Sequence, residues 1–162
     1  PEVAGQLGGK SKFDRNSKPA ILIAPHYDFE GWLGDHLLVS MSAIPCFIVT
    51  EALAKEIATA GLTGCCFGKV NVTTTSWPRT QPKPADFPKF VWLRIEGKAG
   101  IGDFWLSERN DLIVSARALE SLKRFPMNNC RIFDSDNIPS FEEIKRMMVE
   151  DFFKKTGLPR RS

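Results

Sequence analysis

The feature that most constrains this fold is an internal repeat, in which a strand, a helix and a second strand recur after 65 residues. The repeat covers residues 47–68 and 112–133, and it needs no gap across the matched positions. The matched pairs are Ile48 and Ile113, Val49 and Val114, Thr50 and Ser115, Ile57 and Leu122, Gly61 and Pro126, Leu62 and Met127, and Cys65 and Cys130. Each pair keeps one physical role, such as strand core, helix cap or helix stop. Two copies predict a pseudo-symmetric domain whose units pack together.

Helix signals occur at three places in the chain. Thr50 is a good N-cap for a helix over residues 51–60, and Ser115 plays the same part for residues 116–125. A third helix is expected from Ser140 to Thr156, because Ser140 and Glu143 have the spacing of a capping box.

Strands are expected around these helices. The clearest is residues 90–96, where alternation predicts that Val91, Leu93 and Ile95 face the core while Phe90 and Trp92 point outward. Residues 127–133 are expected to close the second repeat as a strand. Residues 77–88 contain four prolines and are expected to form a loop, with a ligand for a proline-reading domain as the alternative.

These elements predict an α+β fold. The two repeat units form a mostly antiparallel sheet with their helices packed on one side, and the C-terminal helix is added to it. Residues 1–18 are polar and are expected to be a flexible lead-in to a single domain over residues 19–159.

Composition restricts the partners. A net charge of +3, from 22 basic and 19 acidic residues, is too small to indicate a nucleic-acid-binding protein. No apolar run approaches the roughly 18 residues of a membrane span. Four cysteines without a CxxC pair favour free thiols in a reducing cytoplasm over a zinc site, so no metal and no cofactor is expected.

No catalytic machinery is recognisable, and the chain is not expected to be an enzyme. It has no Gly-x-Ser-x-Gly motif and no glycine-rich phosphate loop between a strand and a helix. Asp35 and Asp103 could be paired carboxylates, but each follows a glycine, which favours a role in a turn. His26 and His36 are expected to be structural.

What remains is a surface for a protein partner. Trp and Arg are enriched at interface hot spots, and two polar segments offer such residues. The candidates are Trp77, Arg79 and Lys83 in the proline segment, and Glu108, Arg109 and Asp111 in a charged turn that could equally be a solvated loop.

The repeat motifs resemble a large family of bacterial immunity proteins that are encoded beside polymorphic toxins, including Rhs-type and contact-dependent toxins. The matching residues are 47–50 with 61–64, 112–115 with 127–129, and Trp105. The resemblance implies a cytoplasmic protein that neutralises a co-encoded toxin in a stoichiometric complex. A homo-oligomer is compatible with this interpretation. The alternative is a non-catalytic adaptor of a secretion system.

Overall fold

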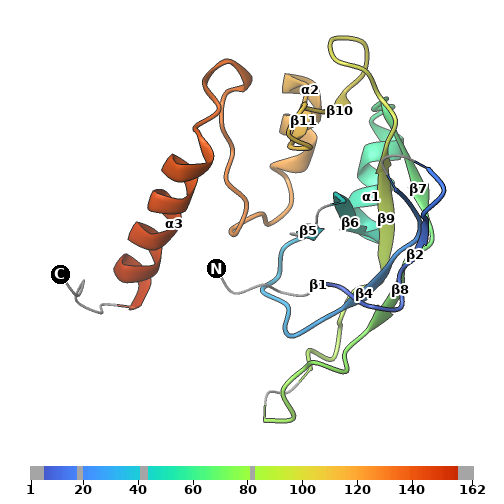
Figure 1. The fold of residues 1–162 in the computed structure, drawn as a ribbon, viewed down its shortest axis with the longest axis vertical. Helices are drawn as coiled ribbons and strands as arrows, with labels where there is room; N and C mark the ends of the chain where they lie inside the picture. The colour runs from blue at the N-terminus through green and yellow to red at the C-terminus, as the bar shows by residue number, and fades with distance from the viewer. Residues whose placement is uncertain (1–5, 18–19, 41–43, 81–82, 157–162) are drawn as a thin grey trace. The chain divides into compact units, whose positions relative to one another are not determined.

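The computed structural model describes residues 6–17, 20–40, 44–80 and 83–156 (Figure 1). The chain divides into two compact units, a larger one within residues 3–129 and a smaller one formed mainly by residues 130–162. The sequence predicts one domain over residues 19–159, whereas the structure separates the chain at Cys130.

The larger unit is built on a four-stranded antiparallel sheet with the order β5-β6-β9-β7. The four strands are β5 (Leu37–Ser40), β6 (Cys46–Thr50), β7 (Cys65–Gly68) and β9 (Phe90–Ile95). In β6 all five residues are buried, because it lies between two strands and both of its faces are covered.

Period-two alternation divides the side chains of this sheet between two cores. Phe47, Val49 and Leu93 belong to one core, which is called the helix-side core because it also contains residues of α1 (Glu51–Thr59) and α2 (Ala116–Leu122). The expectation that the repeat helices share one side of the sheet is therefore confirmed. Cys46 and Ile48 point to the opposite core.

The predicted facing of residues 90–96 is partly wrong. Val91, Leu93 and Ile95 do contact the helix-side core. Phe90, however, is buried in the second core, and Trp92 packs against it. A strand covered on both faces buries both sets of alternating side chains, which a single-faced prediction misses.

The second core is covered by the N-terminal part of the chain. Strands β1 (Gln6–Leu7), β4 (His26–Asp28) and β8 (Asn71–Thr73) form a three-stranded sheet in which β4 and β8 are parallel. β2 (Lys12–Asp14) pairs with β3 (Ile21–Ala24) as a separate antiparallel hairpin. The other strand pairs are antiparallel too, so the mostly antiparallel fold is confirmed, although the strands are divided among four sheets.

The expectation of a flexible lead-in over residues 1–18 is wrong for the part that the structure describes. Residues 6–17 contain β1 and β2, which pair with strands later in the chain. Short polar strands of this kind have no strong local signal, because their pairing depends on distant partners. Residues 1–5 and 18 lie outside the described residues.

Both predicted N-caps are present. The Thr50 hydroxyl accepts a hydrogen bond from the Leu53 N–H at 3.3 Å, and the Ser115 hydroxyl accepts one from the Ala118 N–H at 3.1 Å. Gly61 ends α1 with a positive φ of 62°, as a helix stop requires.

The repeat itself is not confirmed. Each copy contains an antiparallel hairpin followed by a capped helix, since β10 (Phe104–Leu106) and β11 (Leu112–Val114) precede α2. The closing strand is present only in the first copy, as β7. Residues 127–133 form no strand, because no neighbouring strand in the described part of the chain pairs with them.

Two glycines allow β10 to approach the end of the first copy. A Cβ atom at Gly64 or at Gly97 would clash with the backbone oxygen of Phe104. The two glycines also bond to each other, since the Gly64 oxygen accepts hydrogen bonds from the N–H groups of Glu96 and Gly97 at 2.9 and 2.8 Å. These glycines are needed for close backbone approach, in addition to forming a turn.

The smaller unit contains the 3-10 turn η1 (Ser135–Asn137) and the helix α3 (Phe141–Thr156). The predicted capping box is confirmed, because Ser140 N–H donates to the Glu143 carboxylate at 2.8 Å and Glu143 N–H donates to the Ser140 hydroxyl at 3.3 Å. Arg131 forms an ion pair with Asp151 at 2.6 Å. Cys46, Cys65 and Cys66 of the larger unit are free thiols.

Candidate functional site

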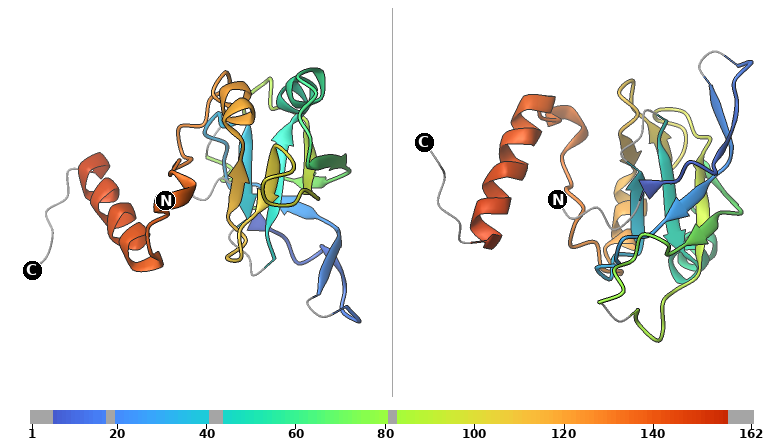
Figure 2. Two further views of the ribbon diagram at one scale, coloured as in Figure 1. Left: turned by 90° about the horizontal axis from the view of Figure 1, so that it is seen from above. Right: turned by 60° about the horizontal axis from the view of Figure 1, so that its bottom comes forward.

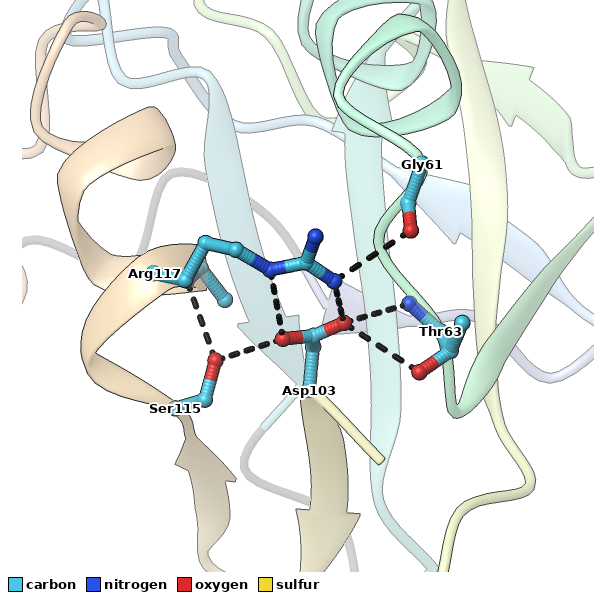
Figure 3. Close-up of polar contacts among 6 residues, drawn as sticks. Gly61, Thr63, Asp103, Ser115 and Arg117 are labelled. Atoms are coloured by element: carbon cyan, nitrogen blue, oxygen red, sulfur yellow. Dashed lines mark hydrogen bonds and ion pairs between the residues drawn. The ribbon is translucent and has the colours of Figure 1, made fainter. Parts of the chain in front are cut away.

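Asp103 is the centre of the densest polar network in the larger unit (Figure 3). The residue is buried, with a relative exposure of 6%. The carboxylate accepts hydrogen bonds from the Thr63 N–H at 2.8 Å, the Ser115 hydroxyl at 2.7 Å and the Arg117 guanidinium at 2.6 Å. The bond from Arg117 is the largest cause of a pKa held well below the usual value of an aspartate. Asp103, just before β10, therefore carries its negative charge at neutral pH and links the chain after α1 to the N-cap of α2.

Asp35 performs a matching task at the other helix. It is 2% exposed, and it accepts hydrogen bonds from the Asn128 and Asn129 N–H groups at 2.8 and 3.0 Å. Asp103 precedes the second hairpin and binds the chain after α1, while Asp35 precedes the first hairpin and binds the chain after α2. The two carboxylates thus link the two hairpin–helix segments reciprocally. Of the two roles considered for them, the structural one fits the donors that surround each carboxylate.

The two histidines also have defined structural partners. His36 Nδ1 lies 2.7 Å from the Thr50 hydroxyl, and His26 Nε2 lies 3.0 Å from the Thr73 hydroxyl. Burial lowers the pKa of His36, against the opposing effect of the nearby Asp35 carboxylate. The neutral ring then suits a hydrogen bond that helps to hold the N-cap of α1.

Asp28 anchors the beginning of the proline segment. Its carboxylate accepts hydrogen bonds from the Thr75 N–H at 3.0 Å, the Thr75 hydroxyl at 2.5 Å and the Ser76 hydroxyl at 3.0 Å. Burial acts to raise the pKa of Asp28, but the hydroxyl groups of Thr75, Thr73 and Ser76 outweigh it and lower that pKa to about 2. The residues just before Trp77 are therefore held against β4.

An aromatic cluster anchors the other end of the proline segment. Phe87 packs edge-on against Trp77 at 5.8 Å between ring centroids, and against Phe29 at 5.1 Å. The Lys83 ammonium lies 4.4 Å from the centre of the Phe87 ring. Trp77 is half-buried rather than freely exposed, while Arg79 and Lys83 are exposed. The structure thus brings Trp77 and Lys83 together on Phe87, with Arg79 between them in the chain.

The charged turn lies on a different connection, between β10 and β11. Arg109 Nε forms an ion pair with Asp111 at 3.0 Å. The Ser107 hydroxyl accepts hydrogen bonds from the Arg109 and Asp111 N–H groups at 3.1 and 3.0 Å, and Asn110 takes a positive φ of 64°. Only Glu108, which is exposed, has no hydrogen-bond partner in the described part of the chain. The turn is closed by its own side chains, which favours the solvated-loop interpretation for Arg109 and Asp111.

Two further surface residues were not predicted. Ile21 and Ile23 on β3 are 56% and 58% exposed. The apolar run that contains β3 suggests a fully buried strand, but within Ile21–Ala24 only Leu22 is buried. The signal that could have shown this lies in Lys12, Phe13 and Asp14, where a polar-apolar-polar alternation indicates a partner strand with one solvent face.

Comparison with known proteins finds no relationship: no family model, no curated protein and no solved structure matches this chain. Among the described helices, none is both long and apolar enough to cross a membrane. Within the same residues, no group of three His, Cys, Asp or Glu side chains is arranged to hold a metal ion.

Proposed function

We propose that this chain is an immunity protein that binds and neutralises a cognate, co-encoded bacterial toxin in a one-to-one complex in the cytoplasm. The resemblance of its repeat motifs to that family supports the proposal. The observation that carries it is the proline segment, which is held at both ends and presents exposed cationic side chains between them.

An anchored loop is well suited to recognition. Binding through a flexible loop loses conformational entropy, whereas a loop that is already ordered loses less. Asp28 holds the residues before Trp77, and Phe87 holds the residues after Lys83. In Figure 1 the described parts of this connection extend beyond the ends of β8 and β9, and the Arg79 and Lys83 side chains within it are exposed.

The prolines support the same interpretation. Each proline fixes its own φ angle and reduces the number of conformations that the free loop samples. Arg79 and Lys83 then present their charges from a restricted backbone. Such a surface fits an acidic patch on a partner protein, because complementary charges steer association and help to select the partner.

The test is a rescue and binding experiment with the product of the neighbouring toxin gene. Cells that express the toxin should survive only when this chain is co-expressed, and the two purified proteins should elute as a one-to-one complex. The variant Arg79→Glu/Lys83→Glu should weaken binding about tenfold or more, because it reverses the charge of the loop.

The matched control is Lys55→Glu/Lys98→Glu, which makes the same change in net charge at two exposed positions away from the loop. It should bind the toxin nearly as well as the wild-type chain. Absence of both rescue and complex would reject the proposal. A complex with a component of the delivery apparatus instead of the toxin would favour the adaptor alternative.

A further inference from the structure

The β2–β3 hairpin has one face in the core and one face in solvent. Phe13 and Leu22 lie opposite each other in register, and both contribute to the second core. Ile21 and Ile23, on the other face of β3, are 56% and 58% exposed. Figure 2 shows the hairpin, in blue, extending beyond the neighbouring strands of the larger unit in both views.

β3 also has a free edge. In the described part of the chain, β2 is its only strand partner. A free strand edge presents N–H and C=O groups that can pair with an added strand. β-branched side chains at alternate positions favour the extended backbone that such pairing needs.

The charge of the hairpin restricts what can occupy this edge. Residues 10–24 contain four basic residues and one acidic residue, namely Lys10, Lys12, Arg15 and Lys18 against Asp14. The Asp14 carboxylate already accepts hydrogen bonds from the Asn16 N–H and the Ser17 hydroxyl, both at 2.9 Å. A second copy of this chain would bring like charges together, whereas an acidic strand would be attracted.

We propose that the free edge of β3 binds an extended segment of the partner protein, in which apolar residues alternate with Asp or Glu. The apolar side chains contact Ile21 and Ile23, and the acidic residues give the segment a negative charge that the net positive charge of the hairpin attracts. This assignment rests on the proposed function, since it names the way in which the partner is recognised.

The first experiment measures the affinity of the co-encoded toxin for hairpin variants. Ile21→Lys/Ile23→Lys should weaken binding about tenfold or more, because it removes both apolar contacts and adds charge at the docking edge. Ile21→Thr/Ile23→Thr keeps β propensity and should weaken binding less. The control is Ile101→Lys, which alters the most exposed large apolar side chain of the described residues, at 81%, and should change the affinity less than twofold (about the limit for a neutral surface position).

The second experiment tests strand pairing directly by amide hydrogen exchange. Residues 21–24 should exchange more slowly in the complex, because an added strand bonds their outward N–H groups. Wild-type affinity for the Ile21→Lys/Ile23→Lys variant, or unchanged exchange at residues 21–24, would overturn the assignment while the proposed function stands.

A synthetic peptide makes the test independent of the toxin. A peptide of about eight residues, alternating Val with Glu, should bind the whole chain and slow exchange at residues 21–24. A peptide alternating Val with Lys should not bind. If the toxin fails to bind but the acidic peptide protects β3, the proposed function fails and the docking edge stands.

Two other occupants have distinct outcomes. A dimer in solution that is lost in Ile21→Lys/Ile23→Lys would show that a second copy covers the edge. Flotation with vesicles that contain phosphatidylserine, lost in the same variant, would show a membrane surface instead. Either result, like the absence of protection by the acidic peptide, would overturn the proposal.

Discussion

The larger unit contains two hairpin–helix segments, β5-β6-α1 and β10-β11-α2, which are called the first and second segment below. They share their local construction but differ in their surroundings. In each, an antiparallel hairpin leads into a helix whose N-cap hydroxyl accepts a hydrogen bond from a backbone N–H three residues later. The strands of the first, β5 and β6, belong to the four-stranded sheet. The strands of the second, β10 and β11, form a sheet of their own.

The difference shows which features depend on local sequence and which do not. A helix start is determined by residues within one turn, so Thr50 and Ser115 produce the same cap in both places. A strand needs a neighbour with unpaired backbone groups. Residues 65–68 pair with β9 and form the strand β7. Residues 127–133 pair with no strand in the described part of the chain.

The largest effect is expected in a test of whether α2 packs as tightly into the shared core as α1 does. Leu53 in α1 and Leu122 in α2 are 0% and 2% exposed, and both belong to the helix-side core. We expect Leu53→Ala and Leu122→Ala each to lower the free energy of unfolding by about 3 kcal/mol, since each leaves a cavity in a shared core. Urea denaturation measures both values. A loss below about 1 kcal/mol for Leu122→Ala alone would show that α2 packs loosely.

Much of the fold could be predicted from the chain alone, because its signals are local. The caps at Thr50 and Ser115, the stop at Gly61 and the capping box at Ser140 are all present. The polar strand β2 and the burial of Phe90 could not be predicted in this way. Both depend on which distant segments cover the sheet, and a period of two does not reveal whether one face or both are buried.

The candidate site was predictable only in part, for a similar reason. Trp77, Arg79 and Lys83 can be selected by residue type alone. The contacts of Phe87 with Trp77 and Lys83 are seen only in the folded structure. Asp35 bonds to a residue 94 positions away, and Asp103 to one 40 positions away. No local sequence pattern predicts either hydrogen bond.

The second test removes one of the two reciprocal carboxylates. Asp103→Asn should lower the free energy of unfolding by about 2 kcal/mol, because the amide cannot accept from all the donors around it and leaves Arg117 without its counter-charge. Asp35→Asn should have a smaller effect, since its three donors are uncharged N–H groups of Asn128 and Asn129. Thermal and urea unfolding at neutral pH measure the two changes.

Acid dependence separates these two variants further. The folded-state pKa of Asp103 lies below its unfolded value of about 3.9, so its stabilising effect is complete above that pH and declines as the pH falls toward the folded pKa. The difference in stability between wild type and Asp103→Asn should therefore shrink below about pH 4. A difference that stays constant with pH would show that the charge of Asp103 contributes little.

The third test compares the caps. Thr50→Ala and Ser115→Ala should each lower the free energy of unfolding by about 1 kcal/mol. Each hydroxyl also has a second partner, His36 for Thr50 and Asp103 for Ser115. Combining Ser115→Ala with Asp103→Asn should therefore destabilise less than the sum of the two changes, while Thr50→Ala with Asp103→Asn should be additive. Urea denaturation of the two double variants distinguishes coupling from independence.

The smallest effect is expected at an ion pair that joins α1 to the chain just after α2. Arg124 Nη1 lies 2.8 Å from the Glu56 carboxylate, but the Arg124 side chain is largely exposed. A double-mutant cycle with Glu56→Gln and Arg124→Gln should give a coupling energy of about 0.3 kcal/mol, which falls further in about 0.5 M NaCl. The pair between Glu120 of α2 and the α2 C-cap residue Lys123 is the control, because it does not link the two hairpin–helix segments. If the Glu56–Arg124 coupling exceeded 1 kcal/mol (roughly the upper limit for exposed pairs), the two segments would be joined electrostatically as well as through their core and their buried carboxylates.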